Sequence, residues 1–216
     1  MTKLYKLTHP YGACVGGGTG VWPLPNGHPG AWLEASGPLV PCQNGLHLCE
    51  VTDLVNWIAP ALWEAEYEGE SIRHEGTKTV VRRARLIKRV DAWNDRNLRL
   101  FACECAERAL DAEEKAGRKV DPRSRAVVEV ARRYARGNAT AEELAAAWEA
   151  AWAAAWAAAG AAAAAARAAA WEAAWAAADA AAAAAAWEEA GAAARAAERD
   201  WQAKRLVELC VEGVEP

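Results

Sequence analysis

Residues 139–200 contain 40 alanines, and nearly all the large side chains among them are tryptophans. Alanine is the strongest helix former, because it loses no side-chain rotamers and hides no polar group when a helix forms. Its methyl group buries little apolar area, so the tryptophans must supply most of the area through which such helices pack. The stretch therefore predicts ordered helices whose packing depends on a few, spaced tryptophans.

The tryptophans recur at helical spacing, four residues apart in each of two groups, and residues at that spacing share one face of a helix. Rings placed this way usually fill a core, where each one occupies the gap beside a small residue of a neighbouring helix. Tryptophan is also enriched at binding hot spots, so some faces are expected to remain for a partner or for self-association. The candidate partner-binding residues are Trp148, Trp152, Trp156, Trp171, Trp175 and Trp187.

Capping signals divide the C-terminal part of the chain into helices. Asp121 is followed by a proline, a pair that favours a helix start, and Thr140 with Glu143 forms a capping box. Gly160 and Gly191 are the candidate breaks in the alanine-rich run. Three antiparallel helices are the preferred arrangement, and one very long helix followed by a short one is the alternative.

The first 92 residues contain all four histidines and most of the glycine and proline. Residues 61–70 alternate between two sets of side chains with a period of two, which predicts a strand with one wet face. Similar signals predict strands at 3–7, 32–34 and 45–49 and one strand or two at 77–90. They also predict a short helix at 52–58, whose first N–H groups Thr52 or Asp53 can cap. We therefore predict an α+β fold, in which a small mixed α/β domain (1–92) precedes an Ala-rich, Trp-packed helical bundle (93–216).

The charge and the composition exclude several classes of protein. A net charge of -4 argues against a nonspecific nucleic-acid binder, which is usually basic. Alanine is near neutral for membrane insertion, and Glu149, Arg167, Glu172 and Asp179 interrupt the alanine run, so we expect no membrane span. The N-terminus lacks the long apolar core of a secretory signal, and the cysteines lack a regular spacing, so we expect a cytoplasmic protein without a disulfide scaffold.

Three residues with metal-ligating side chains, Cys42, His47 and Cys49, lie close together in the sequence, and Cys14 or His28 would complete a tetrahedral zinc shell. Their spacing fits no standard zinc module. The preferred interpretation makes Cys49 a core residue and His47 a hydrogen-bonded, half-buried side chain. We therefore expect no metal site.

The glycine-rich run at residues 16–20 has the composition of a phosphate-binding loop. Such a loop needs a following helix and usually a lysine at its start, and this sequence continues with Val21 and Trp22 instead. A turn is therefore the preferred interpretation. We expect no cofactor and no catalytic residue set.

The succession of strand, short helix and strand across residues 45–69 is similar to that of ADP-ribosyltransferase-like folds. This resemblance implies that His9 and one of the carboxylates Glu64, Glu66 or Glu68 contact nicotinamide ribose, where a carboxylate stabilises developing positive charge. The alternative is that these glutamates form the wet face of a strand.

Residues 42–87, preceded by a Tyr-Lys pair, resemble a domain of unknown function that is common in phage and prophage proteins. The family motif runs Cys–Gly–hydrophobic–His–hydrophobic–Cys and continues to a glycine and a lysine in the two following strands. The resemblance implies a phage-associated protein but no biochemical activity. The matching positions are Cys42, Gly45, His47, Cys49, Gly69 and Lys78.

The segments 97–110, 121–148 and 193–209 resemble the Ala-rich helical immunity proteins of bacterial polymorphic toxin systems. The phrase from Arg123 to Thr140, with its two basic pairs and its glycine, is the most specific part of the match. The activity that this resemblance implies is the binding of a toxin.

Together these features predict a non-enzymatic, phage- or prophage-type accessory protein in the cytoplasm, or in the host cytoplasm if a phage encodes it. Its expected partner is a protein or a second copy of itself, reached through the Ala/Trp-rich helices, with neither a membrane nor nucleic acid involved. The alternatives are a toxin-neutralising immunity protein and an ADP-ribosyltransferase-like enzyme that uses the N-terminal domain.

Overall fold

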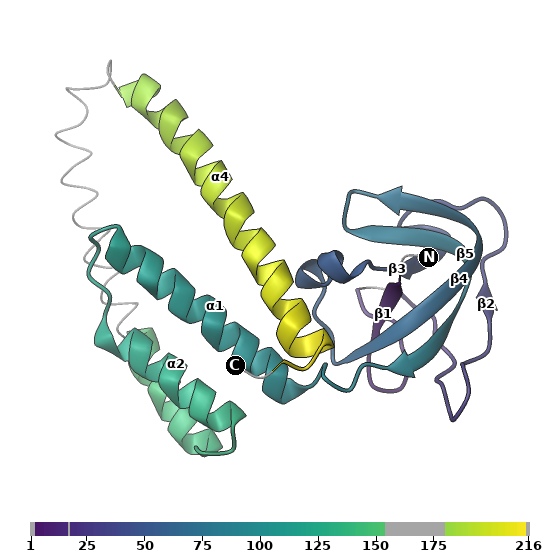
Figure 1. Cartoon of the computed structure of the whole chain (residues 1–216), viewed down its shortest axis with the longest axis horizontal. Helices are drawn as coiled ribbons and strands as arrows, with labels where there is room; N and C mark the ends of the chain where they lie inside the picture. Colours follow the sequence, from purple (N-terminus) through teal and green to yellow (C-terminus); the bar gives the residue numbers. More distant parts are fainter. Residues whose placement is uncertain (1–2, 17, 154–179, 215–216) are drawn as a thin grey trace. The chain divides into compact units, whose positions relative to one another are not determined.

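A computed structural model of the chain describes residues 3–16, 18–153 and 180–214, with side chains described up to residue 153 and again from residue 191. Helices and an antiparallel sheet are both present, so the fold is α+β, as predicted (Figure 1).

The chain divides into two compact units. One, the sheet unit, consists of Met1–Leu98 and Trp201–Pro216, and the other, the helical unit, consists of Arg99–Asp200. The sequence prediction placed one boundary at residue 92 and assigned everything after it to the helical domain. The structure instead groups the C-terminal segment with the sheet.

The sheet unit contains a five-stranded antiparallel sheet in which β1, β4, β5 and β2 follow one another and β3 also pairs with β5. Figure 1 shows β4 and β5 as its two long strands. All five strands lie within or overlap the predicted segments. They are β1 (Leu4–Thr8), β2 (Leu33–Glu34), β3 (Leu46–Leu48), β4 (Ala61–His74) and β5 (Lys78–Arg89).

The core of this unit is built from apolar residues of these strands and from tryptophans of the N-terminal part. The indole of Trp63 donates to the hydroxyl of Thr8 at 2.9 Å, and the indole of Trp93 donates to the carbonyl of Ala59 at 2.8 Å. Both rings are therefore buried without an unpaired N–H group. The central cluster consists of Leu4, Trp22, Leu48, Ala61, Trp63, Ala65, Val81, Ala84 and Leu86.

The wet face of β4 is a ladder of cross-strand ion pairs with β5. In the strand register Glu64 lies opposite Lys88, Glu66 opposite Arg85 and Glu68 opposite Arg83, and each of these pairs is joined by an ion pair. Each exposed pair contributes little to stability. Opposite charges across the strands do oppose a shift in register, which would place the acidic and basic side chains out of step.

The short helix predicted at residues 52–58 is a 3-10 helix, η1 (Val51–Asn56). Asp53 does not cap it as predicted: its carboxylate accepts the backbone N–H of Glu50 at 2.9 Å, so Glu50 is the capping position. The same carboxylate, only 3% exposed, receives two bonds of 2.6 Å from the guanidinium of Arg73 on β4. Asp53 thus ties η1 to the sheet.

The helical unit contains most of α1 (Asp95–Lys115), all of α2 (Pro122–Ala135), a helix described over residues 141–153, and most of α4 (Ala180–Leu206). The predicted caps are confirmed. Asp121 accepts the N–H of Arg123, Thr140 accepts the N–H of Glu143 at 3.1 Å, and Glu143 accepts the N–H of Thr140 at 2.7 Å.

Gly191, one of the two candidate breaks, does not end a helix: α4 continues through it. A single glycine costs roughly 1 kcal/mol relative to alanine within a helix, and the alanines around this one outweigh that cost. Gly160, the other predicted break, lies outside the described residues.

Ion pairs join α1 to α2. Arg125 on α2 binds Asp111 and Glu114 on α1, and Arg132 binds Glu107 at 2.5 Å. Arg125 and Arg132 therefore face α1 rather than solvent alone. Across the described part of the chain, no helix combines the length and the apolarity that crossing a membrane requires.

Candidate functional site

The helix over residues 141–153 presents tryptophan outward. Trp148 and Trp152, one turn apart, are each 59% exposed, whereas Leu144, Ala147 and Ala151 are half-buried. Small residues and one leucine therefore form the inner face of this helix. The prediction of a Trp-packed bundle does not hold for these two tryptophans, because more than half of each side chain is exposed.

The other four candidate residues are not placed. Trp156, Trp171 and Trp175 lie outside the described residues, and Trp187 belongs to α4 at a position whose side chain is not described. The tryptophan face is therefore defined here by Trp148 and Trp152.

The tryptophan face lies in an acidic stretch of sequence. Residues 141–190 contain seven carboxylates and one arginine. Glu142, Glu143 and Glu149 are exposed on the same helix, although Glu143 pairs with Arg133 at 3.1 Å. Exposed carboxylates therefore lie on the same helix as the two exposed rings.

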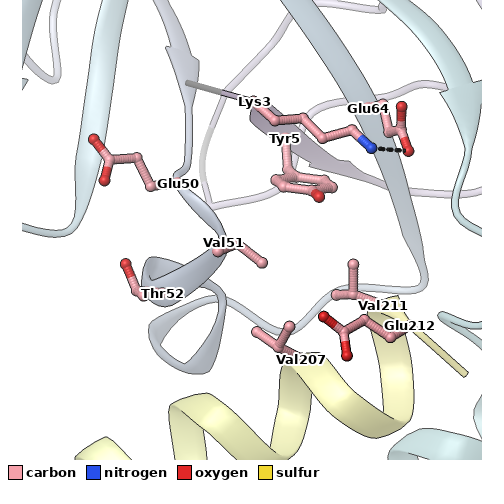
Figure 2. A pocket seen from close by; sticks show the side chains of 9 residues that line it. All are labelled: Lys3, Tyr5, Glu50, Val51, Thr52, Glu64, Val207, Val211 and Glu212. Atoms are coloured by element: carbon pink, nitrogen blue, oxygen red, sulfur yellow. Dashed lines mark ion pairs between the residues drawn. The ribbon is translucent and has the colours of Figure 1, made fainter. Parts of the chain in front are cut away.

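The sheet unit contains a pocket of about 470 Å³. Figure 2 shows Lys3 reaching Glu64 on β4, the ring of Tyr5 beside them, and valines of the C-terminal segment facing them from the other side. That segment continues α4 as the short π-helix η2 (Val207–Val211). The lining residues are Lys3, Tyr5, Glu50, Val51, Thr52, Glu64, Val207, Val211 and Glu212.

The electrostatics of the pocket favour cations. Three of its lining residues are glutamates and one is a lysine, and that lysine is already bound to Glu64 at 2.6 Å. The hydrogen bond to Glu64 raises the pKa of Lys3, and burial raises the pKa of Tyr5. Both shifts move these groups further from neutral pH, where a general acid or base would have to titrate.

The residues expected of an ADP-ribosyltransferase are not gathered in one place. Glu64 lines the pocket, but Glu66 and Glu68 lie on the ladder and are paired with Arg85 and Arg83. His9 is exposed in the turn that follows β1 and is not part of the pocket lining.

The two cysteines considered as zinc ligands, Cys42 and Cys49, differ in exposure. Cys49 is buried and exchanges two backbone hydrogen bonds with Tyr5. Cys42 is exposed, and its N–H donates to Nε2 of His47 at 3.1 Å. Among the described residues, no three histidine, cysteine or acidic side chains are arranged to hold a metal ion.

Sequence reasoning missed His74, whose Nε2 atom lies 3.9 Å from the sulfur of Cys42. The two residues are far apart in the chain. The only sequence signal that could have found this contact is the Glu75-Gly76 turn, which predicts that the strands on either side of it form a hairpin.

The glycine-rich run at residues 16–20, described except for position 17, closes a loop: the N–H of Cys14 donates to the carbonyl of Gly20, and Ala13 pairs with Val21. Extended backbone follows it instead of a helix, so the described part of the loop lacks the helix N-terminus that binds phosphate.

No family model, curated protein or solved structure matches this chain.

Proposed function

We propose that the protein is a non-enzymatic binding protein whose helical unit takes a protein partner on the tryptophan face. The observation that carries this proposal is the exposure of Trp148 and Trp152, 59% each, one turn apart on a helix with a firm N-terminal cap. Two tryptophans at that spacing form one continuous apolar surface.

Covering this face would contribute substantially to a complex. A fully exposed tryptophan presents about 250 Å², so covering the 59% of each ring that is exposed contributes roughly 4 kcal/mol at about 25 cal/mol per Å², before the cost of association is subtracted. Contributions of that size are typical of binding hot spots, where tryptophan is the most enriched residue.

The charge around this face favours a different protein over a second copy of this chain. A self-pairing of this helix would bring its exposed carboxylates, Glu142 and Glu149, against the same carboxylates of the second copy, and like charges brought together oppose association. We infer a partner with an apolar groove bordered by lysine or arginine, which would receive the helix by its exposed face.

The phage-type accessory role and the toxin-neutralising role are both forms of this proposal, because each requires a protein partner. They differ in the identity of that partner. If the partner is a toxin, its activity is lost when the complex forms. If the partner is a phage structural protein, forming the complex is itself the role of the protein.

The geometry of the pocket gives less support to the enzymatic alternative. The pyrophosphate of NAD would meet three carboxylates and one already paired lysine in the pocket that contains Glu64. We therefore expect no heat of NAD binding in calorimetry with the folded protein. A saturable heat that is lost in Glu64→Gln would instead favour the enzyme.

The partner can be identified by photo-crosslinking. A photo-reactive residue at position 145, which is exposed one turn before Trp148, is expected to capture a distinct protein in the cells that produce this chain. The double variant Trp148→Ala, Trp152→Ala should abolish capture, whereas Tyr67→Ala, which removes an exposed aromatic ring from the sheet unit, should not. Adducts with a second copy of the chain alone would overturn the proposed partner class.

A further inference from the structure

Four side chains that can carry chemistry converge at one end of the sheet. The sulfur of Cys42 accepts a hydrogen bond from the ammonium of Lys78 at 3.1 Å and lies 3.9 Å from Nε2 of His74. The backbone N–H of Cys42 donates to Nε2 of His47 at 3.1 Å. None of these contacts belongs to the pocket or to the tryptophan face.

The turn that carries Cys42 is held rigidly. Val40 and Asn44 exchange two backbone hydrogen bonds of 2.8 Å, and the side-chain amide of Asn44 donates to the carbonyls of Ser36 and Pro38. Within this frame Cys42 has φ 65°, a left-handed conformation that a residue with a side chain rarely adopts. Such strain persists only where the surroundings enforce it, and it is concentrated at functional positions.

The ammonium of Lys78 and the imidazole of His74 beside the sulfur are positioned by the hairpin of β4 and β5. His74 and Lys78 form the last cross-strand pair before the turn, in which Glu75 and Gly76 both have positive φ, as hairpin twist requires. The ammonium of Lys78 also lies 5.4 Å from the centre of the Trp57 ring. The carboxylate of Glu75, 3.5 Å from Nε2 of His74, is the acidic group facing this cluster.

Cys42 differs from the other cysteines, all six of which lie in the described part of the chain. It alone is exposed, Cys49, Cys103 and Cys210 are buried, and the remaining two are half-buried. Burial raises the pKa of Cys49 to about 11 and that of Cys105 to about 11. These thiols stay protonated and unreactive at neutral pH.

We propose that Cys42 is a site of thiol–disulfide exchange with small anionic disulfides. The thiolate, which forms when the thiol releases its proton to water, attacks one sulfur of the disulfide. A mixed disulfide with Cys42 forms, the original S–S bond breaks, and the other half leaves as a thiolate that takes up a proton. The ammonium of Lys78, 3.1 Å from the sulfur, lies where it can pair with the sulfur during attack and draw in the anionic reagent.

The geometry favours modification over acyl transfer. A cysteine hydrolase needs backbone N–H groups free to stabilise an oxyanion, and the N–H of Cys42 is already bound to His47. The carboxylate of Glu75 approaches Nε2 of His74, the same nitrogen that faces the sulfur, so it does not orient the ring from the opposite side as in a catalytic triad.

The test is the rate of adduct formation with oxidised glutathione at neutral pH, followed by mass spectrometry with mapping of the modified cysteine. We expect one fast adduct, on Cys42, which is absent from Cys42→Ser. Lys78→Met should slow the reaction about tenfold because it removes the positive charge, and Lys78→Arg should restore most of the rate. Lys88→Met, a lysine of the same strand that pairs with Glu64, is the control and should react like the native protein.

A neutral reagent, hydroxyethyl disulfide, distinguishes attraction of the anion from an effect on the sulfur itself. We expect Lys78→Met to slow the reaction with hydroxyethyl disulfide less than it slows the reaction with oxidised glutathione. Circular dichroism identifies any variant that fails to fold, and labelling in urea gives the rate for an unstructured Cys42. The proposal is overturned if the folded protein reacts at Cys42 no faster than the chain in urea, if the fast adduct maps to Cys14, or if Lys78→Met reacts as fast as Lys88→Met.

Discussion

Asp53 is a buried charged residue of the sheet unit that makes several polar contacts. Its carboxylate is 3% exposed and holds the Arg73 guanidinium through two bonds of 2.6 Å and the Glu50 N–H through a third. A buried carboxylate is tolerated only when charge and hydrogen bonds compensate for its lost hydration. Here one residue satisfies the start of η1 and fixes it to β4.

Replacing this carboxylate is expected to be costly. Asp53→Ala should lower the free energy of unfolding by about 2–3 kcal/mol, less than for a fully buried pair, because the Arg73 side chain is 37% exposed and water replaces part of what it loses. Glu68→Ala, which removes an exposed ion pair with Arg83, should cost about 0–1 kcal/mol. Urea unfolding of the two variants measures the difference, and equal values would contradict the role given to Asp53.

His47 makes stability depend on pH. Burial, together with the positive charges of Lys6 and Lys78, lowers its pKa from 6.5, and its Nε2 accepts the N–H of Cys42 only while that nitrogen is unprotonated. As the pH falls, the unfolded chain takes up the proton first, so the free energy of unfolding should decline as the pH drops through 6.5 toward the folded pKa and should not depend on this group above that range. Urea unfolding from about pH 8 to about pH 5 should show a smaller decline in the free energy of unfolding for His47→Gln than for the native chain. The same decline in both proteins would contradict this role of His47.

At the scale of elements, local signals in the sequence predicted where most strands and two helix starts lie. Alternation predicted the strands, and Asp121 and Thr140 predicted helix starts that the structure confirms. Pairing was not predictable in the same way, because it depends on register between distant segments. The contact of Cys42 with His74 arises only because β5 pairs with both β3 and β4.

Helix faces show the same limit. On α1 the residues Leu98, Cys105 and Ala109 follow helical spacing with Phe101, but they are half-buried or exposed. The buried residues are Leu100, Phe101 and Cys103. The pattern of apolar residues on this helix is weak, so its neighbours decide which side is covered. The core prediction did not hold for Trp148 and Trp152 for a related reason: with so much alanine, small residues were available for the less exposed face of their helix.

Gly45 is the residue that lets β3 approach β5. Its φ is 133°, and a Cβ there would lie 2.3 Å from Cγ1 of Val80 on β5. Gly45→Ala should therefore destabilise the protein by roughly 3 kcal/mol or more, the sum of backbone strain and steric overlap. Gly76→Ala is the matched control, because its φ of 66° is also positive but no atom lies within 4 Å, and it should cost only about 1 kcal/mol. Thermal unfolding distinguishes the two, and equal losses would show that overlap with Val80 is not the cause.

At the scale of the whole chain, the C-terminal segment belongs with the first 98 residues. Leu206, Leu209 and Cys210 are fully or almost fully buried, and the amide of Asn97 donates to the carbonyl of Leu209 at 3.0 Å. The sequence could not show this return, because the segment continues the helical pattern of the alanine-rich run. Its higher content of leucine and valine is the only hint.

The two roles assigned to large apolar side chains can be compared directly. Leu209→Ala should lower the free energy of unfolding by about 2–5 kcal/mol, because a side chain 1% exposed leaves a cavity. Trp148→Ala should change it by less than about 1 kcal/mol, since most of that ring is exposed. If Trp148→Ala proves as destabilising as Leu209→Ala in urea unfolding, Trp148 belongs to a core, and its assignment to a binding surface is contradicted.

The most direct test of the proposed function is the affinity for the crosslinked partner, measured by calorimetry with purified proteins. We expect Kd for Trp148→Ala, Trp152→Ala to be at least about 30-fold weaker than for the native chain, equivalent to about 2 kcal/mol, and native binding to weaken as salt screens the acidic surface. An unchanged Kd in the double variant would contradict the assignment of the tryptophan face as the binding surface.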